Sequence, residues 1–429
     1  MGVLQLTIIT MINMMGSGII MLPTNLAQVG TMSILSWIVT AGGAMCLAYA
    51  FSRAGMYTKN DGGMGGYAEY AYGKAGSFLA NFTYGISLVI ANVAIAISAV
   101  GYFEQLFHWN FNPVGVALAT IITLWLASVM NFGGASATGK ISTFTVWGVI
   151  IPVVFVSILG WFWFNPHMYI AAWNPHHLGF FNGISSSIAI TLWAFLGLES
   201  ASANMDAVEN PKKNVPIAVL GGTIGAAIMY IVSTNVVQGI VGNKLLANSN
   251  APFGLVFSHM FNPVIGSIVM GLMVLSCFGS LLGWQFTIAE VFRSSAQEGY
   301  FPKVFKKVVG NGTPIHGIIL ITTVQSLLAL MTISPSLSKQ FTILVNLAVV
   351  TNVVPYLLSM GALKTMQLDA QNHKLDKKIV IISLMASVYS LYAIFAAGNE
   401  ALAYGALVTF AGWTLYGIIA DKFYKRETN

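Results

Sequence analysis

The sequence predicts an all-α polytopic membrane protein with twelve transmembrane helices. Of its 429 residues, 56% are hydrophobic and only 7% are charged, too few to cover a water-soluble domain of this size. The apolar residues gather in stretches of about 20, the length that a helix needs to cross a bilayer core. These stretches do not alternate as strands do, which favours helices over a barrel.

The expected helices follow one another with short connections. They cover residues 3–28, 33–52, 77–106, 113–131, 141–164, 182–208, 214–240, 264–292, 315–334, 340–363, 377–396 and 400–420. No loop is long enough for a second globular domain, so residues 1–429 are expected to form a single transmembrane domain. The first stretch lacks the basic region and cleavage site of a signal peptide, which predicts a retained first helix. A start so close to the membrane leaves room for a few natural residues ahead of Met1.

The basic residues test this topology independently. In the twelve-helix order, all but two of the 19 Lys and Arg residues fall on one side, and only Lys244 and Lys339 fall on the other. The positive-inside rule makes the basic side cytoplasmic and places both termini there. The net charge of +6 therefore indicates membrane orientation rather than a nucleic-acid partner.

Glycines interrupt the first helix of each half of the chain. Residues 1–164 and 182–364 hold five helices each, in opposite orientations, and 377–420 adds two more. Gly16-Ser17-Gly18 breaks the first helix, next to Asn13, and Gly197 breaks the sixth. Matching breaks predict a five-plus-five inverted repeat with broken helices 1 and 6 and a substrate site between them. The alternative for the first motif is a small-residue surface for close helix packing.

Glu199 is the acidic residue that the sequence places deepest in the membrane. A charge there costs about 2.5 to 3.5 kcal/mol, so it requires a cation, a proton or water. No Lys or Arg is expected at that depth, which favours a substrate ammonium group or a proton as its partner. The alternative is a protonated carboxyl group that ties the broken helix to a neighbour.

Aromatic side chains near Glu199 could enclose an amine. Trp193 and Trp284 suit cation–π contact with an ammonium group, although tryptophans in membranes also serve as core or interface residues. Trp193 precedes Glu199 by six residues, so a regular helix would point the two in different directions. They converge on one ligand only if the chain unwinds near Gly197.

Two further segments carry polar residues of interest. Tyr84 and Asn92 share one face of the third helix, where Asn92 would bind substrate or cap a broken neighbour. The glycine-rich segment 62–66, followed by Glu69 and Tyr70, lacks the strand and the lysine of a phosphate-binding loop. A flexible gate at the cytoplasmic entrance is expected there, with Glu69 and Tyr70 in it.

The seven histidines point away from metal chemistry. All lie in loops or at helix ends of the predicted topology, so we expect no metal, no cofactor and no intramembrane metalloprotease. A membrane-embedded enzyme would require a buried nucleophile or metal set, and a channel would conduct without countertransport. Both remain as alternatives to a carrier.

Four stretches, 13–20, 62–70, 192–200 and 209–216, resemble those of the amino acid, polyamine and organocation transporters. Within that superfamily the chain is similar to the basic amino acid and polyamine antiporters, over its whole length. The resemblance implies an inverted-repeat carrier with alternating access to a central site. It also implies a location in the lipid bilayer of the bacterial inner membrane, often as a homodimer.

The resemblance also assigns roles. The glycine motif at 16–18 would hold the amino and carboxylate end of the substrate, Trp193 and Trp284 would stack on it, Asn92 would contact it and Glu199 would handle charge. The implied reaction is exchange of putrescine for ornithine, with proton-coupled putrescine uptake as a second mode. Cadaverine with lysine and agmatine with arginine remain alternatives, because one methylene changes affinity by only about 1 to 3 kcal/mol.

Overall fold

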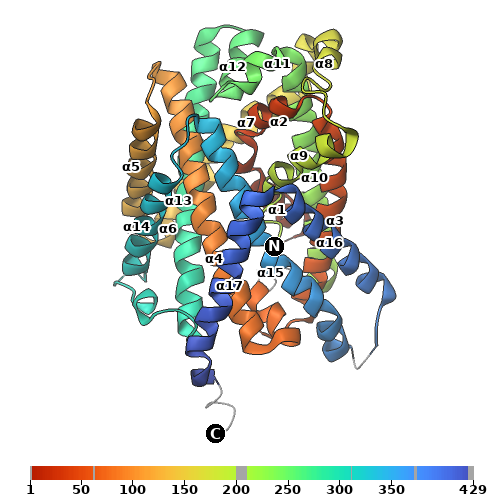
Figure 1. Ribbon diagram of the computed structural model, residues 1–429, viewed down its shortest axis with the longest axis vertical. Coiled ribbons are helices and arrows are strands. Elements are labelled where there is room, and N and C mark those ends of the chain that lie inside the picture. Colours follow the sequence, from red (N-terminus) through yellow and green to blue (C-terminus); the bar gives the residue numbers. More distant parts are fainter. Residues whose placement is uncertain (1, 61–62, 200–209, 311, 372–373, 424–429) are drawn as a thin grey trace.

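The computed structural model describes residues 2–60, 63–199, 210–310, 312–371 and 374–423. Every regular element in this part of the chain is a helix (Figure 1). The α-helices are α1 (Val3–Met15), α2 (Leu22–Val29), α3 (Ser33–Tyr57), α4 (Met64–Phe107), α5 (Pro113–Asn131), α6 (Ala135–Thr145), α7 (Trp147–Leu159), α8 (Pro166–Ala171), α9 (Phe180–Trp193), α10 (Pro211–Ile240), α11 (Asn243–Ala247), α12 (Pro252–Met260), α13 (Pro263–Gln297), α14 (Ile315–Met331), α15 (Leu337–Ala370), α16 (Lys377–Ala396) and α17 (Asn399–Ile419). Short 3-10 turns lie at Ser17–Ile19 (η1), Gly160–Trp163 (η2) and Lys303–Lys306 (η5).

Length and hydropathy confirm a polytopic membrane protein. Among the described residues, nine helices are long and apolar enough to cross a bilayer, when α6, α7 and η2 are taken as one continuous helix, Ala135–Trp163. Three shorter apolar helices, Val3–Ile12, Phe180–Trp193 and Ile315–Met331, fall in further predicted stretches. The helices α8, α11 and α12 cap one end of the bundle, at the top of Figure 1, and α17 leads to the opposite end. These three end helices were not predicted, because they are too short to cross a bilayer.

Local sequence explains where several long helices begin. The side chains of Asn112, Asn262, Ser336 and Asp376 each accept a hydrogen bond from a backbone N–H in the first turn of α5, α13, α15 and α16. Such caps satisfy donors that the helix itself leaves unpaired. Proline follows the first two of them, and its fixed φ suits the first helical position.

Burial separates the central helices from the outer ones. In α4, 89% of the most apolar 18-residue window is buried, whereas the corresponding share in α17 is 11%. The helices α13 and α15 pack against α4 and share its central position. Leucine, isoleucine and phenylalanine side chains are exposed along α5, α14, α16 and α17, as expected for lipid-facing surfaces.

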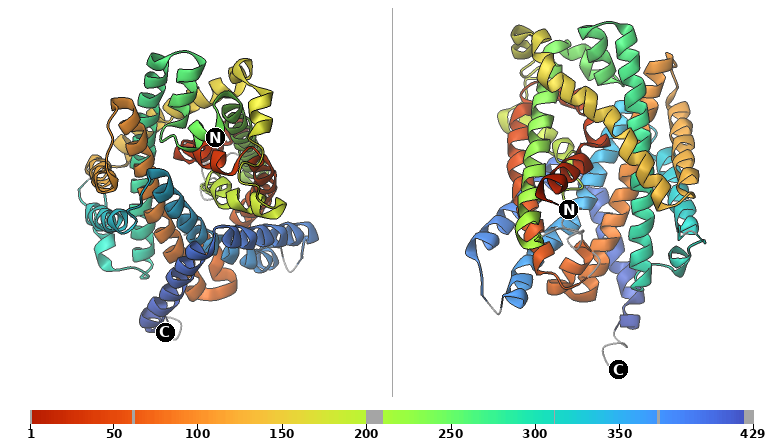
Figure 2. Two further views of the ribbon diagram at one scale, coloured as in Figure 1. Left: turned by 45° about the horizontal axis from the view of Figure 1, so that its top comes forward. Right: turned by 180° about the vertical axis from the view of Figure 1, so that it is seen from behind.

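The first predicted helix, 3–28, is interrupted. Its first part, α1, ends at Met15, with Gly16 at a non-helical ψ of −121°, and η1 leads into α2. The segment α1 packs against α10 (Figure 2, right). In the sixth predicted helix, α9 ends at Trp193 and a series of turns continues to residue 199. Gly197 has φ +102°, a conformation that favours glycine. Most of the rest of that predicted helix, 200–208, lies outside the described residues.

The two interruptions touch each other. A Cβ on Gly18 would lie 3.4 Å from the Cα of Ala194. Tyrosines satisfy backbone carbonyls that the breaks release: Tyr102 donates to the Ile20 oxygen at 3.0 Å, and Tyr230 donates to the Ala194 oxygen at 2.8 Å. Buried carbonyls without partners are costly in a bilayer, so these hydroxyl groups stabilise the unwound backbone.

The expectation of a flexible loop at 62–70 is wrong from residue 64 onward. Helix α4 already begins at Met64, and a kink at Gly73, with φ +61°, separates 64–72 from the membrane-crossing part. The Lys74 ammonium group forms an ion pair with Glu69 across this kink. A helix was missed here because four glycines in a row of five residues indicate a turn rather than a helix.

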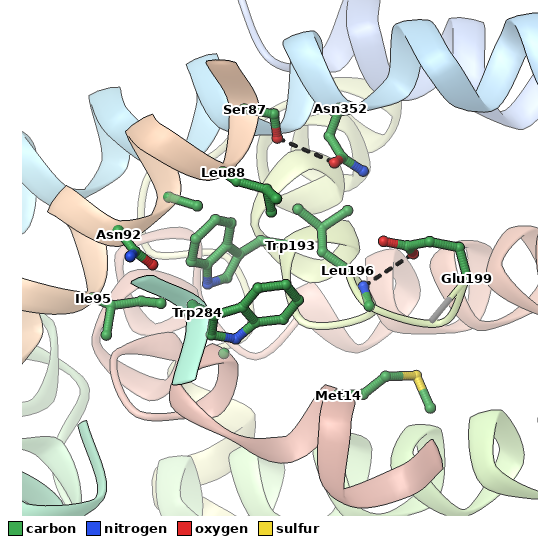
Figure 3. A pocket seen from close by; sticks show the side chains of 13 residues that line it. Met14, Ser87, Leu88, Asn92, Ile95, Trp193, Leu196, Glu199, Trp284 and Asn352 are labelled. Atoms are coloured by element: carbon green, nitrogen blue, oxygen red, sulfur yellow. Dashed lines mark hydrogen bonds between the residues drawn. The ribbon is translucent and has the colours of Figure 1, made fainter. Parts of the chain in front are cut away.

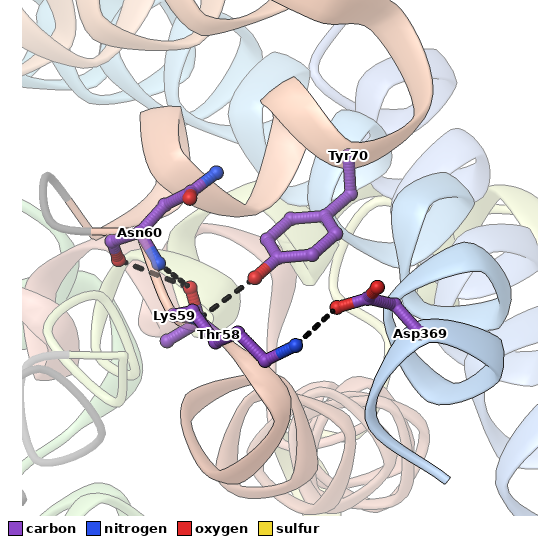
Figure 4. Close-up of polar contacts among 5 residues, drawn as sticks. All are labelled: Thr58, Lys59, Asn60, Tyr70 and Asp369. Carbon is purple, nitrogen blue, oxygen red and sulfur yellow. Dashed lines mark hydrogen bonds and ion pairs between the residues drawn. The ribbon is translucent and has the colours of Figure 1, made fainter. Parts of the chain in front are cut away.

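Polar contacts join residues 59 and 70 to each other and to the end of α15 (Figure 4). The backbone N–H of Lys59 donates to the Tyr70 hydroxyl oxygen at 2.7 Å, and the Lys59 Nζ lies 3.0 Å from Asp369 Oδ2 at the end of α15. Two residues further along, at the C-cap of α15, the Gln371 amide donates to the Tyr57 hydroxyl oxygen at 3.0 Å. These contacts hold the ends of α3 and α15 together.

Candidate functional site

A cavity of about 40 Å³ lies in the middle of the bundle, beside the two helix breaks (Figure 3). Five segments contribute to its wall: the first break, α4, the second break, α13 and α15. The lining residues are Met14, Gly18, Ser87, Leu88, Ala91, Asn92, Ile95, Trp193, Leu196, Gly197, Glu199, Trp284 and Asn352.

The structure brings most of the predicted substrate-binding residues to this cavity. Gly18, Asn92, Trp193, Glu199 and Trp284 line it directly. Tyr84 does not line the cavity itself, but its hydroxyl group donates a hydrogen bond to Glu199, which does. Gly16 is the C-cap of α1, where a Cβ would approach Ser280 Oγ to 3.2 Å. The side chains of Asn13 and Ser17 lie outside the described part of the structure. Glu69 and Tyr70 lie apart from the cavity, in the contacts at the inner end of α4.

Glu199 is buried, with 8% of its surface exposed, and its carboxylate accepts three hydrogen bonds. The Tyr356 hydroxyl donates to Oε2 at 2.6 Å, the Gly197 N–H donates to the same oxygen at 3.1 Å, and the Tyr84 hydroxyl donates to Oε1 at 3.2 Å. Among the described side chains, no Lys or Arg forms an ion pair with it. Within the described part of the chain, the hydrogen-bond donors to the carboxyl group of Glu199 are therefore all neutral.

The unwound chain meets the geometric condition for convergence of Trp193 and Glu199. Between them the backbone follows turns rather than a helix, and Gly197 takes a positive φ. As a result, the indole and the carboxylate face the same cavity (Figure 3).

The two tryptophans form aromatic walls of the cavity. Trp193 packs edge-on against Phe341 of α15, with ring centroids 6.4 Å apart and an interplanar angle of 86°. Its Nε1 is buried and has no hydrogen-bond partner among the described residues. Trp284 enters from α13 and lies beside Trp193 in Figure 3. The faces of such rings attract ammonium groups.

Helix α15 supplies cavity residues that the sequence analysis missed. Asn352 lines the cavity and accepts a hydrogen bond from Ser87 Oγ at 3.1 Å, and Tyr356 holds Glu199. Asn352 and Tyr356 are one turn apart in an apolar stretch, as Tyr84 and Asn92 are two turns apart in α4. The same reasoning that selected Asn92, a polar side chain in an apolar helix, applies to Asn352 and would have found it.

Together these residues suit an organic cation. A carboxylate offers charge, amide and hydroxyl oxygens offer acceptors, and aromatic rings enclose the space between them. A small amine with a short methylene chain matches this combination, because its charged ends need acceptors and its middle needs apolar walls.

Comparison with known proteins agrees with this chemistry. The amino acid permease family matches residues 1–416. The chain is 65% identical over 424 residues to the putrescine transporter PotE of Haemophilus influenzae, covering 98% of this chain and 97% of that protein. It is 62% identical to the putrescine transporter PotE of Escherichia coli, covering 99% and 97%.

A more distant relative carries a different name. The cadaverine/lysine antiporter of Escherichia coli is 32% identical over 420 residues, covering 97% of this chain and 92% of that protein. The family match extends over nearly the whole sequence, and the relatives named here align from end to end. The chain therefore belongs to the amino acid permease family, and it is a membrane transporter rather than an enzyme.

Proposed function

We propose that this chain exchanges putrescine for ornithine across the inner membrane of a bacterium, and that it also takes up putrescine with protons. The observation that carries the proposal is the buried Glu199 carboxylate, which faces the central cavity with hydroxyl and amide donors and forms no ion pair with a Lys or Arg of the described segments. Identity of 62% to 65% with proteins named putrescine transporter supports the choice of substrate.

In this proposal, an ammonium group of the substrate pairs with Glu199. The walls formed by Trp193 and Trp284 enclose the methylenes, and the backbone at the first break, 16–18, receives the amino and carboxylate end of ornithine. Unwound backbone offers free N–H groups for a carboxylate. Putrescine has no carboxylate, so it would use the cavity acceptors alone.

The tyrosine contacts give a reason for strict exchange. Tyr84 of α4 and Tyr356 of α15 both donate a hydrogen bond to Glu199 in the second break, so the carboxylate links three elements. An ammonium group of the substrate competes with these hydroxyls for the carboxylate oxygens of Glu199 and weakens the hydrogen bonds that link the three elements. The empty carrier then reorients slowly, because its buried charge keeps the protein donors engaged.

We further infer a twelve-helix topology with a five-plus-five inverted repeat, comprising 1–164, 182–364 and the two additional helices in 377–420. The nine long and three shorter apolar helices among the described residues support the count, and the contact between Gly18 and Ala194 supports paired breaks. The positive-inside pattern favours cytoplasmic termini. The exposed apolar surfaces of α16 and α17 suit contact with lipid or with a second copy in a homodimer.

Exchange of cadaverine for lysine is the competing proposal within transporters. It is supported by a relative at 32% identity, well below the identity to the putrescine transporters. A pocket distinguishes homologous amines only modestly, at about 1 to 3 kcal/mol per methylene. Direct competition is therefore required to separate the two.

The test uses purified protein in liposomes loaded with labelled putrescine. External ornithine is expected to accelerate efflux of the label, while lysine and arginine at the same concentration leave it near the rate without amino acid. Liposomes without protein provide the background. Equal acceleration by lysine, or efflux that no external substrate changes, would contradict the proposal.

A further inference from the structure

A network of buried amide and hydroxyl groups lies behind Asn92, on the side away from the cavity. It comprises Ser128 of α5, Gln285 of α13, and Thr322 and Gln325 of α14, all of them almost completely buried. The Asn92 Nδ2 donates to Gln285 Oε1 at 2.7 Å. Gln285 and Gln325 pair reciprocally, with Nε2 to Oε1 distances of 2.9 and 3.0 Å.

The hydroxyl groups of Ser128 and Thr322 determine the orientation of the Gln285 side-chain amide, that is, the positions of its Nε2 and Oε1 atoms. Ser128 Oγ is 2.8 Å from the Leu124 carbonyl oxygen, and Thr322 Oγ1 is 2.7 Å from the Ile318 carbonyl oxygen. The two hydroxyls are also 2.6 Å from each other. These are three contacts between oxygen atoms, and only the two hydroxyl protons are available to form hydrogen bonds in them. An amide oxygen of Gln285 placed here would add another such contact with no proton to fill it.

The Gln285 Nε2 must therefore face the hydroxyls, and it lies 3.2 Å from Ser128 Oγ and 2.9 Å from Thr322 Oγ1. This orientation turns the Gln285 Oε1 toward Asn92. An amide oxygen accepts but cannot donate, so Asn92 has to present its NH₂ group to Gln285. The Asn92 Oδ1 is then left for the cavity. In Figure 3 the red oxygen of Asn92 lies on the side of Trp193, with the blue nitrogen on the other side.

We infer that Ser128, Thr322 and Gln285 are positioning residues that hold the Asn92 carbonyl oxygen toward the cavity as an acceptor for an ammonium group of the substrate. The inference rests on the proposed function and deepens it. Glu199 receives one ammonium group, and Asn92 Oδ1 receives the second one of putrescine, or the one at the other end of ornithine. Without the network, the Asn92 amide can turn and present N–H groups, which repel a cation.

Removing the hydroxyl groups of Ser128 and Thr322 tests this orienting network, called the relay below, without changing a residue that lines the cavity. The variant Ser128→Ala/Thr322→Val is nearly isosteric, and it lets Gln285 turn. We expect the KM for putrescine to rise about tenfold, the effect of one lost hydrogen bond to a charged group, with kcat nearly unchanged. Thr120→Val is the matched control: it removes a buried hydroxyl of α5 bonded to the Val116 carbonyl oxygen alone. Unchanged KM in the double variant, or an equal rise in the control, would overturn the inference.

An aspartate at position 92 provides the second arm. Aspartate presents acceptors whichever way it turns, so its interaction with an ammonium group does not depend on the orientation of Gln285. In a protein that keeps Asn92, Gln285→Met is therefore expected to raise the KM for putrescine about tenfold. In an Asn92→Asp background, the same substitution should raise it less than twofold. Equal effects in both backgrounds would mean that Gln285 supports packing only.

A binding measurement separates failure of the inference from failure of the proposed function. The rise in melting temperature that putrescine produces reports affinity without requiring transport. If the unsubstituted protein binds putrescine but does not exchange it for ornithine, the proposed antiport fails while the relay is still tested by binding. If the double variant does not fold, Thr322→Val alone, compared with Thr120→Val, tests the same contact, and an unchanged putrescine-induced rise contradicts the relay.

Discussion

The Tyr356 hydroxyl lies 2.6 Å from Oε2 of Glu199, and it joins α15 to the turn that follows α9 across 157 residues of sequence. This is the shortest of the three hydrogen bonds that the carboxylate accepts. A hydroxyl donor stabilises the negative charge but does not neutralise it. In the proposed mechanism, the charge of Glu199 is therefore left for a mobile cation.

Replacing the carboxylate by its neutral isostere tests the role of that charge. In Glu199→Gln we expect putrescine–ornithine exchange to fall roughly 10- to 100-fold, because a hydrogen bond to a charged group contributes about 1.5 to 3 kcal/mol. Counterflow in proteoliposomes measures the loss. Glu104→Gln is the control, since Glu104 is another buried carboxyl group, bonded to the Phe111 N–H near the end of α4. Its variant should exchange normally. Full exchange by Glu199→Gln would exclude charge pairing.

Tyr356→Phe should weaken the empty protein more than the loaded one. The lost donor leaves a buried carboxylate less well satisfied, at a cost of about 1 to 3 kcal/mol. Putrescine supplies a new donor, so its stabilising effect should be larger in this variant than in the unsubstituted protein. Thermal unfolding with and without putrescine measures the difference. In Tyr392→Phe, which removes a hydroxyl bonded to Ser185 between α16 and α9, the effect of putrescine should stay unchanged.

The aromatic wall at Trp284 can be tested by ring size and charge affinity. Trp284→Leu should raise the KM for putrescine about 2- to 30-fold, corresponding to a cation–π contribution of roughly 0.5 to 2 kcal/mol, and Trp284→Phe should raise it less. Initial rates over a range of putrescine concentrations give these values. The control Trp413→Leu alters an exposed ring on α17 and should leave the KM as it is. Equal KM values for the Leu and Phe variants would argue against a cation–π contact.

The ion pair between Lys59 and Asp369 should contribute little to the stability of the protein. Lys59 and Asp369 have 70% and 48% of their side-chain surfaces exposed, so water screens their attraction. We expect Asp369→Asn to unfold at the same temperature as the unsubstituted protein, in scans at low and at high salt. A clear drop that high salt abolishes would show that this pair holds α3 to α15 more firmly than its exposure indicates.

Composition and periodicity were sufficient for the membrane fold and for much of the site. The predicted stretch 113–131 coincides with α5, and 377–396 coincides with α16, because hydrophobic length alone defines such spans. Glu199 and Asn92 were found because a polar group inside an apolar helix is costly and so requires a partner.

The contacts of those residues could not be predicted in the same way. Tyr356 is one of 16 tyrosines, and nothing local distinguishes it until folding brings α15 beside the second break. Likewise, Gln285 meets Asn92 across 193 residues. Pairings of this kind depend on which faces of distant helices meet, and helical periodicity identifies a face without identifying its neighbour.

The hydroxyl groups of Tyr102 and Tyr230 satisfy the carbonyls of both interruptions from within the protein. The protein therefore supplies donors for the open backbone from its own side chains and does not require the substrate to supply them. Members of the family could then change their substrate specificity by substituting a few side chains of the cavity wall, while the backbone conformation stays the same.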